Sequence, residues 1–235
     1  MTSAPTNSSA RPLIALISAT PAAIPPARKA FSDNFPDAEL LNILDDGLQE
    51  QANRAGGLTA HLTERMKRLI NHAVLEGADG ILLTCSIYSS VAQLVAGDLA
   101  IPILGPDDAA FTFATQSGYR SILILASLPT ALADVQARLV AAADRLGLPL
   151  QVRGAVAEGA FAAVQADDHA ALLAALSDTA AANGAADVDA ILLAQYSLTP
   201  VVDRLQVQLG IPVLSGPTLA AQTLRDAVAA TAAQP

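Results

Sequence analysis

The sequence predicts an α/β fold built from two similar halves, each a mainly parallel sheet flanked by helices. Short aliphatic runs of strand length recur along the chain. Longer helical stretches alternate with these runs, for instance residues 62–78 and 129–147, and each ends near a glycine. The second half also repeats landmarks of the first. Alternation of this kind is typical of an α/β sheet, and the repeat indicates two subdomains of similar topology.

The expected strands are near-continuous aliphatic runs without polar alternation. Such runs indicate strands that are covered on both faces, as in a parallel sheet. In chain order, the predicted strands are residues 12–18, 40–44, 80–85, 101–105, 121–127, 190–195 and 211–216.

Three landmarks define the repeat. "ADGILLTCSIYS" from Ala78 aligns with "VDAILLAQYSLT" from Val188, and "IPILGP" from Ile101 aligns with "IPVLSGP" from Ile211, both at a shift of 110 residues. "LIALIS" meets "ILILAS" at a shift of 109. We therefore expect a flexible tail at 1–10, a first subdomain at 11–106 and a second at 107–216. A C-terminal helix at 217–235 is expected to pack back on the first subdomain.

The composition limits the classes of function. With 235 residues, of which 52% are hydrophobic, the chain can bury a sizeable core. A net charge of −9 and 3% aromatic residues argue against a nucleic-acid partner. No apolar run has the 18 residues of a membrane span. The segment "MTSAPTNSSARP" lacks the order of a secretion signal, so a cytoplasmic protein is expected.

Small polar residues follow the predicted strands at the edge where parallel sheets bind ligands. If the two halves face each other, Cys85 and Gln195 lie on opposite sides of one cleft, which becomes the expected active site. The other polar residues at strand ends are candidates for the same cleft, although turn or helix-capping roles explain each of them equally well. They are Ser18, Thr20, Ser127 and Thr130.

Cys85 is the only cysteine of the chain, so it forms no internal disulfide and no metal cluster by itself. A thiol between a strand end and a helix beginning near Ser86 is expected to have its pKa lowered by about a unit or more, which favours the thiolate. The alternative is a buried cysteine that acts as a small hydrophobic residue. No phosphate-binding loop, dinucleotide fingerprint or metal-ligand spacing is present, so we expect no cofactor and no metal.

The motifs at these strand ends resemble those of the aspartate/glutamate racemase superfamily, which includes hydantoin racemase, maleate isomerase and arylmalonate decarboxylase. The resemblance covers residues 12–228. It rests on "LLTCS" (82–86), "LLAQYS" (192–197), the two "IPIL/IPVL" segments and "LASLPT" (125–130). It implies two pseudo-symmetric α/β subdomains and cofactor-independent proton chemistry next to a substrate carboxylate. A homodimer is a further expectation from similar enzymes.

Racemases of this superfamily place one cysteine on each side of the substrate, and here the resemblance is incomplete. The first cysteine position falls on Cys85, and the second is occupied by Gln195. Because glutamine neither takes nor gives a proton at ordinary pH, symmetric racemisation between two thiols is not available. The resemblance implies Cys85 as the reacting thiolate. The implied substrate-binding residues are Thr84, Ser86, Ser127 and Thr130, with Gln195, Tyr196 and Ser197 facing them.

We therefore predict a racemase or isomerase type of enzyme that acts on a small carboxylate through Cys85. Decarboxylation of a malonate-like acid, followed by protonation from Cys85, is the main alternative. Isomerisation through a covalent Cys85 adduct, or a racemase with Tyr196 as its second acid/base, are others. A small-carboxylate binding protein without catalysis also remains open. The expected partner is a small carboxylate, with no nucleic acid and no membrane.

Overall fold

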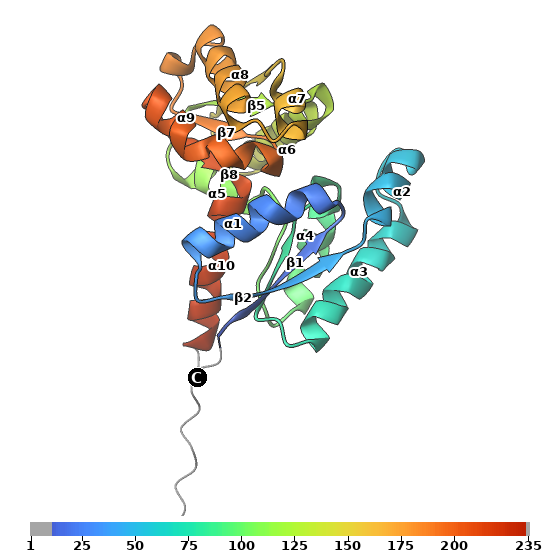
Figure 1. The fold of residues 1–235 in the computed structure, drawn as a ribbon. Coiled ribbons are helices and arrows are strands. Elements are labelled where there is room, and N and C mark those ends of the chain that lie inside the picture. The colour runs from blue at the N-terminus through green and yellow to red at the C-terminus, as the bar shows by residue number, and fades with distance from the viewer. Residues whose placement is uncertain (1–10, 234–235) are drawn as a thin grey trace, which may run out of the picture.

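The computed structural model describes residues 11–233, so the predicted tail at 1–10 and the last two residues of the predicted C-terminal segment lie outside the described residues. The two halves of the chain form two stacked bodies, each with its own sheet (Figure 1). Within the described part, none of the helices is both long and apolar enough to cross a membrane.

The first sheet has the strand order β2-β1-β3-β4, and all of its neighbouring strands are parallel. Its strands are β1 (Leu13–Ser18), β2 (Glu39–Leu44), β3 (Gly80–Leu83) and β4 (Ile103–Leu104). The helices of this half are η1 (Pro21–Ala23), α1 (Ile24–Asn34), α2 (Gly47–Ala55), α3 (Ala60–Leu75), η2 (Ser86–Tyr88), α4 (Ser89–Val95) and η3 (Ala96–Asp98).

The second sheet repeats this arrangement with the order β6-β5-β7-β8, again all parallel. Its strands are β5 (Ser121–Ala126), β6 (Gln151–Val156), β7 (Ala190–Leu193) and β8 (Val213–Ser215). The remaining helices are α5 (Asp108–Gln116), α6 (Pro129–Arg145), α7 (Ala160–Gln165), α8 (His169–Ala182), η4 (Ala185–Asp187), η5 (Tyr196–Val201), α9 (Val202–Leu209) and α10 (Gly216–Ala232). The predicted α/β class with two parallel sheets is therefore confirmed.

Two details differ from the sequence prediction. Strand β6 has no predicted counterpart, because "QVRGAV" carries an arginine and a glycine and lies at the sheet edge, partly exposed. The repeat of the first strand is also off by one residue. Ile14 pairs with Gly80, and Ile122 pairs with Ala190, so these equivalent first-strand positions are 108 residues apart, not 109. Ser127 is therefore the counterpart of Ala19, and Ser18 is the counterpart of Ala126.

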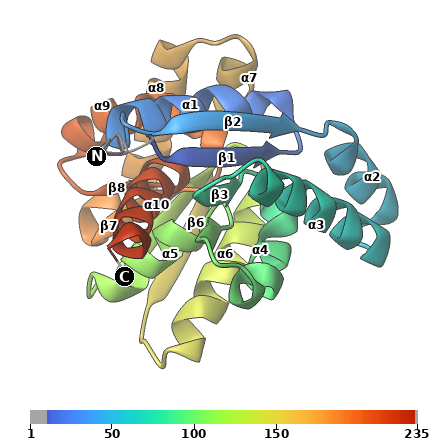
Figure 2. The same ribbon diagram turned by 90° about the horizontal axis from the view of Figure 1, so that it is seen from below.

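Both faces of each sheet are covered. Alternate residues of β1 and β3 face α2, α3 and α4 on one side and α1 and α10 on the other. Figure 2 shows α1 and α3 on opposite sides of the first sheet. The second sheet lies between α5 and α6 on one face and α7, α8 and α9 on the other. Burial on both faces explains why the strands read as unbroken aliphatic runs.

Two helices connect the halves by a reciprocal exchange. Helix α5 follows the last strand of the first sheet, yet it packs on the second sheet through Ala110 and Phe111. Helix α10 follows the last strand of the second sheet and packs on the first through Leu224 and Val228. The long red helix α10 runs beside the first half in Figure 1. Because each half contributes a helix to the other's core, the strand ends of both sheets are held in a defined relative position.

Candidate active site

A cavity of about 510 Å³ lies between the two halves at the carboxyl ends of their strands. Cys85 reaches it from the end of β3, and Gln195 reaches it from the equivalent point after β7. The two residues line one space because β3 and β7 occupy the same place in the two sheets. Further predicted site residues that line it are Thr20, Thr84, Ser86, Tyr196 and Ser197.

Cys85 lies two residues beyond the end of β3, immediately before the short helix η2. Its side chain is partly buried, and its thiol donates a hydrogen bond to Gln49 Oε1 at 3.2 Å. Burial raises the pKa of the Cys85 thiol, the backbone N–H of Ile87 opposes this, and the charge of Asp107 raises it further. The prediction of a lowered pKa is wrong, because desolvation outweighs the short helical turn that follows. Cys85 therefore rests as the thiol near neutral pH.

Gln49 is a site residue that the sequence prediction missed. It lies on α2, lines the cavity and donates through Nε2 to Asn53 Oδ1 at 3.2 Å, which orients its oxygen toward Cys85. The start of α2 is held by Asp45, which accepts two hydrogen bonds from Arg65 at 2.6 and 2.7 Å. One feature of the sequence could have indicated Gln49. It follows soon after the predicted strand at 40–44, in the first turn of α2, and the carboxyl end of β2 lies beside that of β1.

Gln195 is held by Ser127. The Gln195 Oε1 atom accepts hydrogen bonds from the backbone N–H of Ser127 at 2.7 Å and from its hydroxyl at 3.1 Å. With its oxygen engaged, Gln195 can present its amide N–H groups to the cavity as neutral donors. Ser127 is itself buried and is not among the described residues that line the cavity. Its contact with the site is therefore made through Gln195.

Tyr196 lines the cavity, but its hydroxyl points elsewhere. It donates a hydrogen bond to the Pro106 carbonyl at 3.1 Å, across the junction between the halves. Burial raises the pKa of Tyr196 well above its ordinary value, and the charges of Asp107 and Asp108 add to the effect. A hydroxyl that is buried, paired and hard to ionise is poorly suited to the predicted alternative in which Tyr196 is the second acid/base.

Ser18 and Thr84 form a buried pair. The Thr84 hydroxyl donates to Ser18 Oγ at 2.9 Å, and Ser18 has no exposed surface. Ser18 therefore lies behind Thr84, and the hydroxyl proton of Thr84 is directed into the protein. Thr130 is exposed near the start of α6 and, like Ser18, is not among the described residues that line the cavity.

The remaining walls are uncharged. Within residues 11–233, the lining holds no Asp, Glu, His, Lys or Arg side chain, and no group of three His, Cys, Asp or Glu residues could hold a metal ion. Non-polar and neutral residues that the sequence prediction did not place in the site complete it. They are Ala22, Ala23, Phe161, Val164 and Gln165, and Leu128 also lines the cavity.

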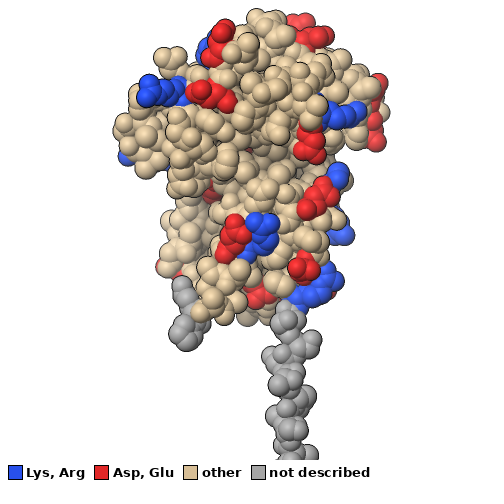
Figure 3. Space-filling view, turned by 90° about the vertical axis from the view of Figure 1, so that its left-hand side faces the viewer, with Lys and Arg blue, Asp and Glu red and all other residues tan. Residues whose placement is uncertain are grey.

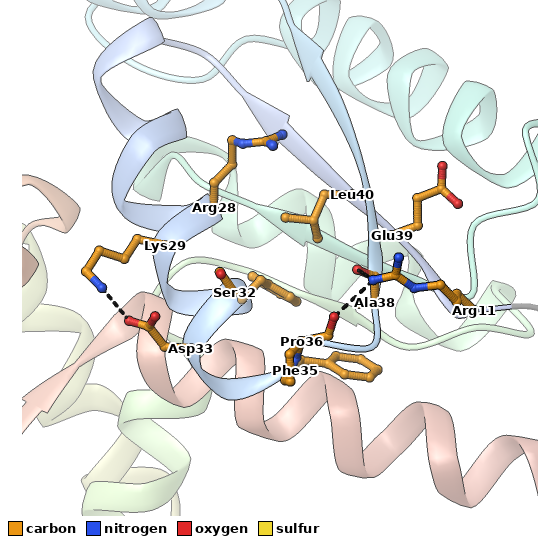
Figure 4. Close-up of a pocket in the computed structure, with 11 residues that line it drawn as sticks. Arg11, Arg28, Lys29, Ser32, Asp33, Phe35, Pro36, Ala38, Glu39 and Leu40 are labelled. Carbon is orange, nitrogen blue, oxygen red and sulfur yellow. Dashed lines mark hydrogen bonds and ion pairs between the residues drawn. The ribbon is translucent and has the colours of Figure 1, made fainter.

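A larger cavity, of about 690 Å³, lies apart from Cys85 between α1 and the edge strand β2 (Figure 4). Two of its cations are already engaged. Arg11 donates to the backbone carbonyls of Pro36 and Asp37, and Lys29 pairs with Asp33 at 2.7 Å. Its described lining holds no cysteine and no cluster of residues from the carboxyl ends of the strands, so we place the candidate site at Cys85 and not in the larger cavity.

Charged side chains are dispersed over the face of the protein that Figure 3 shows. On the face shown in Figure 3, basic and acidic residues are interspersed, and its described part shows no continuous basic area.

Known structures share this fold at low sequence identity. Allantoin racemase from Klebsiella pneumoniae is 18% identical with a TM-score of 0.63, and the match covers 93% of this chain and 88% of that one. Aspartate racemase from Picrophilus torridus is 14% identical with a TM-score of 0.66, covering 93% and 94%. An unliganded arylmalonate decarboxylase is 20% identical with a TM-score of 0.60, covering 95% and 94%. None of the curated proteins matches the chain.

The sequence itself carries the family assignment. The profile of the Asp/Glu/hydantoin racemase family matches residues 6–224, which span both sheets and the strand ends around Cys85 and Gln195. The described fold agrees with that of the racemase structures. The chain therefore belongs to the Asp/Glu/hydantoin racemase family.

Proposed function

We propose that the protein is a cofactor-independent isomerase of the racemase type, which transfers a proton at the carbon next to the carboxylate of a small acid. Cys85 is the group that carries the proton. One observation supports this above the others. A cavity between the halves is lined by one thiol, on one side, and by the neutral amide of Gln195 from the equivalent strand end.

In this proposal the thiolate of Cys85 removes the proton from the α-carbon, and the electron pair moves onto the carboxylate as an enediolate. The Gln195 amide and the Ser86 and Ser197 hydroxyls donate hydrogen bonds to its oxygens, where negative charge develops. The Cys85 thiol then returns the proton to the same face and becomes the thiolate again. Alternatively, water delivers a proton to the face of Gln195, and the Cys85 thiol gives its proton to the hydroxide that remains. Inversion therefore depends on water, because the second side has no thiol.

Deuterium exchange in heavy water tests the proposal. With 2-substituted carboxylic acids as substrates, deuterium should enter the α-carbon faster than the configuration inverts, because a single thiol returns the proton to its own face. Cys85→Ala should lower exchange by about 10²–10⁴-fold, the usual contribution of one acid/base group. Cys85→Ser is the matched control for cavity shape. Exchange at the wild-type rate in Cys85→Ala would contradict the proposal, as would binding of these acids without any exchange.

A second candidate is decarboxylation of a malonate-like acid. The raised pKa of Cys85 favours it, because loss of CO₂ leaves an enediolate that needs only a proton, and the resting thiol supplies one. Isomerisation instead requires the thiolate first. The arylmalonate decarboxylase fold likeness is compatible with this candidate. Release of CO₂ from 2-substituted malonates with formation of a single enantiomer is the result expected for it.

A further inference from the structure

A second cavity adjoins the one at Cys85. The neighbouring cavity has a volume of about 480 Å³. The two share three lining residues, namely Ala22 from η1, Val164 from α7 and Ser197 from η5. A ligand with its carboxylate beside Cys85 that passed these residues would enter the second space. Both cavities lie between the halves, since residues from both line each of them.

The second cavity is mostly non-polar. Its walls include Pro25 and Pro26 from α1, Leu172 from α8 and Pro200 from η5. Three proline rings make a stiff surface, because each has a fixed backbone φ, so little ordering is needed when a ligand binds. This is a surface suited to the side of a hydrocarbon group.

The charged residues of the second cavity already have partners. Lys29 forms an ion pair with Asp33 at 2.7 Å, and His169 lies 3.3 Å from Asp167. All four side chains are roughly half exposed or more, so these groups are solvated at the outer rim. A second carboxylate on the ligand would gain little there, because exposed pairs contribute about 0–1 kcal/mol.

The Cys85 cavity excludes another class of substrate. Of the described residues that line it, none carries a carboxylate that could pair with an α-ammonium group. An ammonium moved from water into this neutral space would lose hydration and would find no oppositely charged partner among these residues. A zwitterionic amino acid is therefore a poor fit, whereas an acid with an uncharged α-substituent fits the lining.

We propose that the substrate is a 2-substituted carboxylic acid whose substituent is a long non-polar chain seated in the second cavity. This inference rests on the proposed function, because it assumes that the carboxylate binds beside Cys85. The chain passes Ala22 and Val164, runs along the proline wall and ends near the solvated rim at Lys29 and His169.

Protection of Cys85 from iodoacetamide provides the test, since it reports binding at the site without requiring turnover. The probes are 2-methylbutanoic, 2-methylhexanoic and 2-methyldecanoic acid. In the wild-type protein, the dissociation constant should fall by about fourfold for each added methylene group that is buried. Pro25 lines the second cavity but not the first, so Pro25→Trp should fill the second cavity alone. In this variant the dissociation constants of the longest and shortest acids should become nearly equal. Pro25→Ala is the matched control that leaves the space open.

The outcomes separate the two proposals. If the short acid protects Cys85 but affinity does not rise with chain length, the substrate class is wrong and the proposed function stands. The same holds if the length dependence persists unchanged in both Pro25→Trp and Pro200→Trp, the second variant that narrows this cavity. If no acid of any length protects Cys85 and the exchange experiment also fails, the proposed function itself is wrong.

Discussion

Two residues at equivalent strand ends define the candidate site, and their surroundings differ. Cys85 donates to Gln49 on α2, whereas Gln195 is held by Ser127 through its oxygen. Burial raises the pKa of Cys85, which is the proton-transfer group of the proposed function, whereas Gln195 offers neutral hydrogen-bond donors. The two sides of the site therefore differ in chemistry, although the strands that carry Cys85 and Gln195 have the same arrangement in both halves.

The pH dependence of catalysis should distinguish the two candidate reactions. Burial raises the pKa of Cys85 above the ordinary thiol value, so the thiol is the main form at neutral pH. Isomerisation begins with the thiolate, so its kcat/KM should rise as pH increases through this pKa. Decarboxylation uses the thiol, so its rate should fall over the same range. Alkylation of Cys85 by iodoacetamide measures the pKa independently, and a midpoint below the ordinary thiol value would contradict this assignment.

At the scale of elements, an aspartate carboxylate forms hydrogen bonds with the backbone at the start of the first strand in each sheet. Asp79 accepts a hydrogen bond from the backbone N–H of Leu13 at 2.7 Å. Asp189, at the equivalent position, accepts from the N–H groups of Arg120 and Ser121 at 2.7 and 2.9 Å. Each carboxylate lies just before the third strand of its half and ties it to the start of the first. The repeat is therefore present in these contacts as well as in the aliphatic runs.

Asp189→Asn should reduce stability in a pH-dependent way. The backbone N–H groups of Arg120 and Ser121 lower the pKa of Asp189 below its ordinary 3.8. A carboxylate with a lowered pKa stabilises the fold at pH values above 3.8, and this contribution is lost as pH falls through the folded-state pKa. The difference in Tm between wild type and Asp189→Asn should therefore be largest near neutral pH and shrink below pH 3.8. A difference that stays constant across that range would contradict the carboxylate's role.

Most of the fold at this scale could be predicted from the sequence. Buried parallel strands produce unbroken aliphatic runs, and such runs identified seven of the eight strands. Strand β6 was missed because an edge strand with Arg153 and Gly154 in it has no such run. The positions at which strands end were predicted less accurately than the strands themselves. The predicted strand at 80–85 stops at Leu83, because Thr84 and Cys85 leave the ladder before η2 begins.

Across the whole molecule, the junction between the halves is closely packed at Gly216. This residue begins α10, and a Cβ atom added there would lie 2.7 Å from the Pro106 carbonyl oxygen and 3.0 Å from Tyr196 Cε1. The backbone of one half thus passes against a loop of the other with no room for a side chain. The hydrogen bond from Tyr196 to Pro106 spans the same junction.

Gly216→Ala should destabilise the protein, by about 1–3 kcal/mol, the usual cost of overpacking. Urea unfolding measures the change. Gly97→Ala is the matched control, because a Cβ atom at Gly97 would meet no heavy atom of the described structure within 4 Å. Equal stability of the two variants would contradict the prediction, because it would show that the backbone at the junction can move to accommodate a Cβ atom. Since the junction also supports Tyr196, Gly216→Ala should weaken ligand protection of Cys85 more than the control does.

The sequence by itself determined the α/β class, the repeat and the placing of Cys85 and Gln195 at matched strand ends. These features are local or periodic, so they can be read from aliphatic runs and their spacing. Only the tertiary structure decided the state of Cys85, the part played by Gln49, the inward-facing hydroxyls of Thr84 and Tyr196, and the second cavity. Each of these depends on which distant segments enclose a group. Desolvation and hydrogen bonding are set by that enclosure, and spacing along the chain does not reveal it.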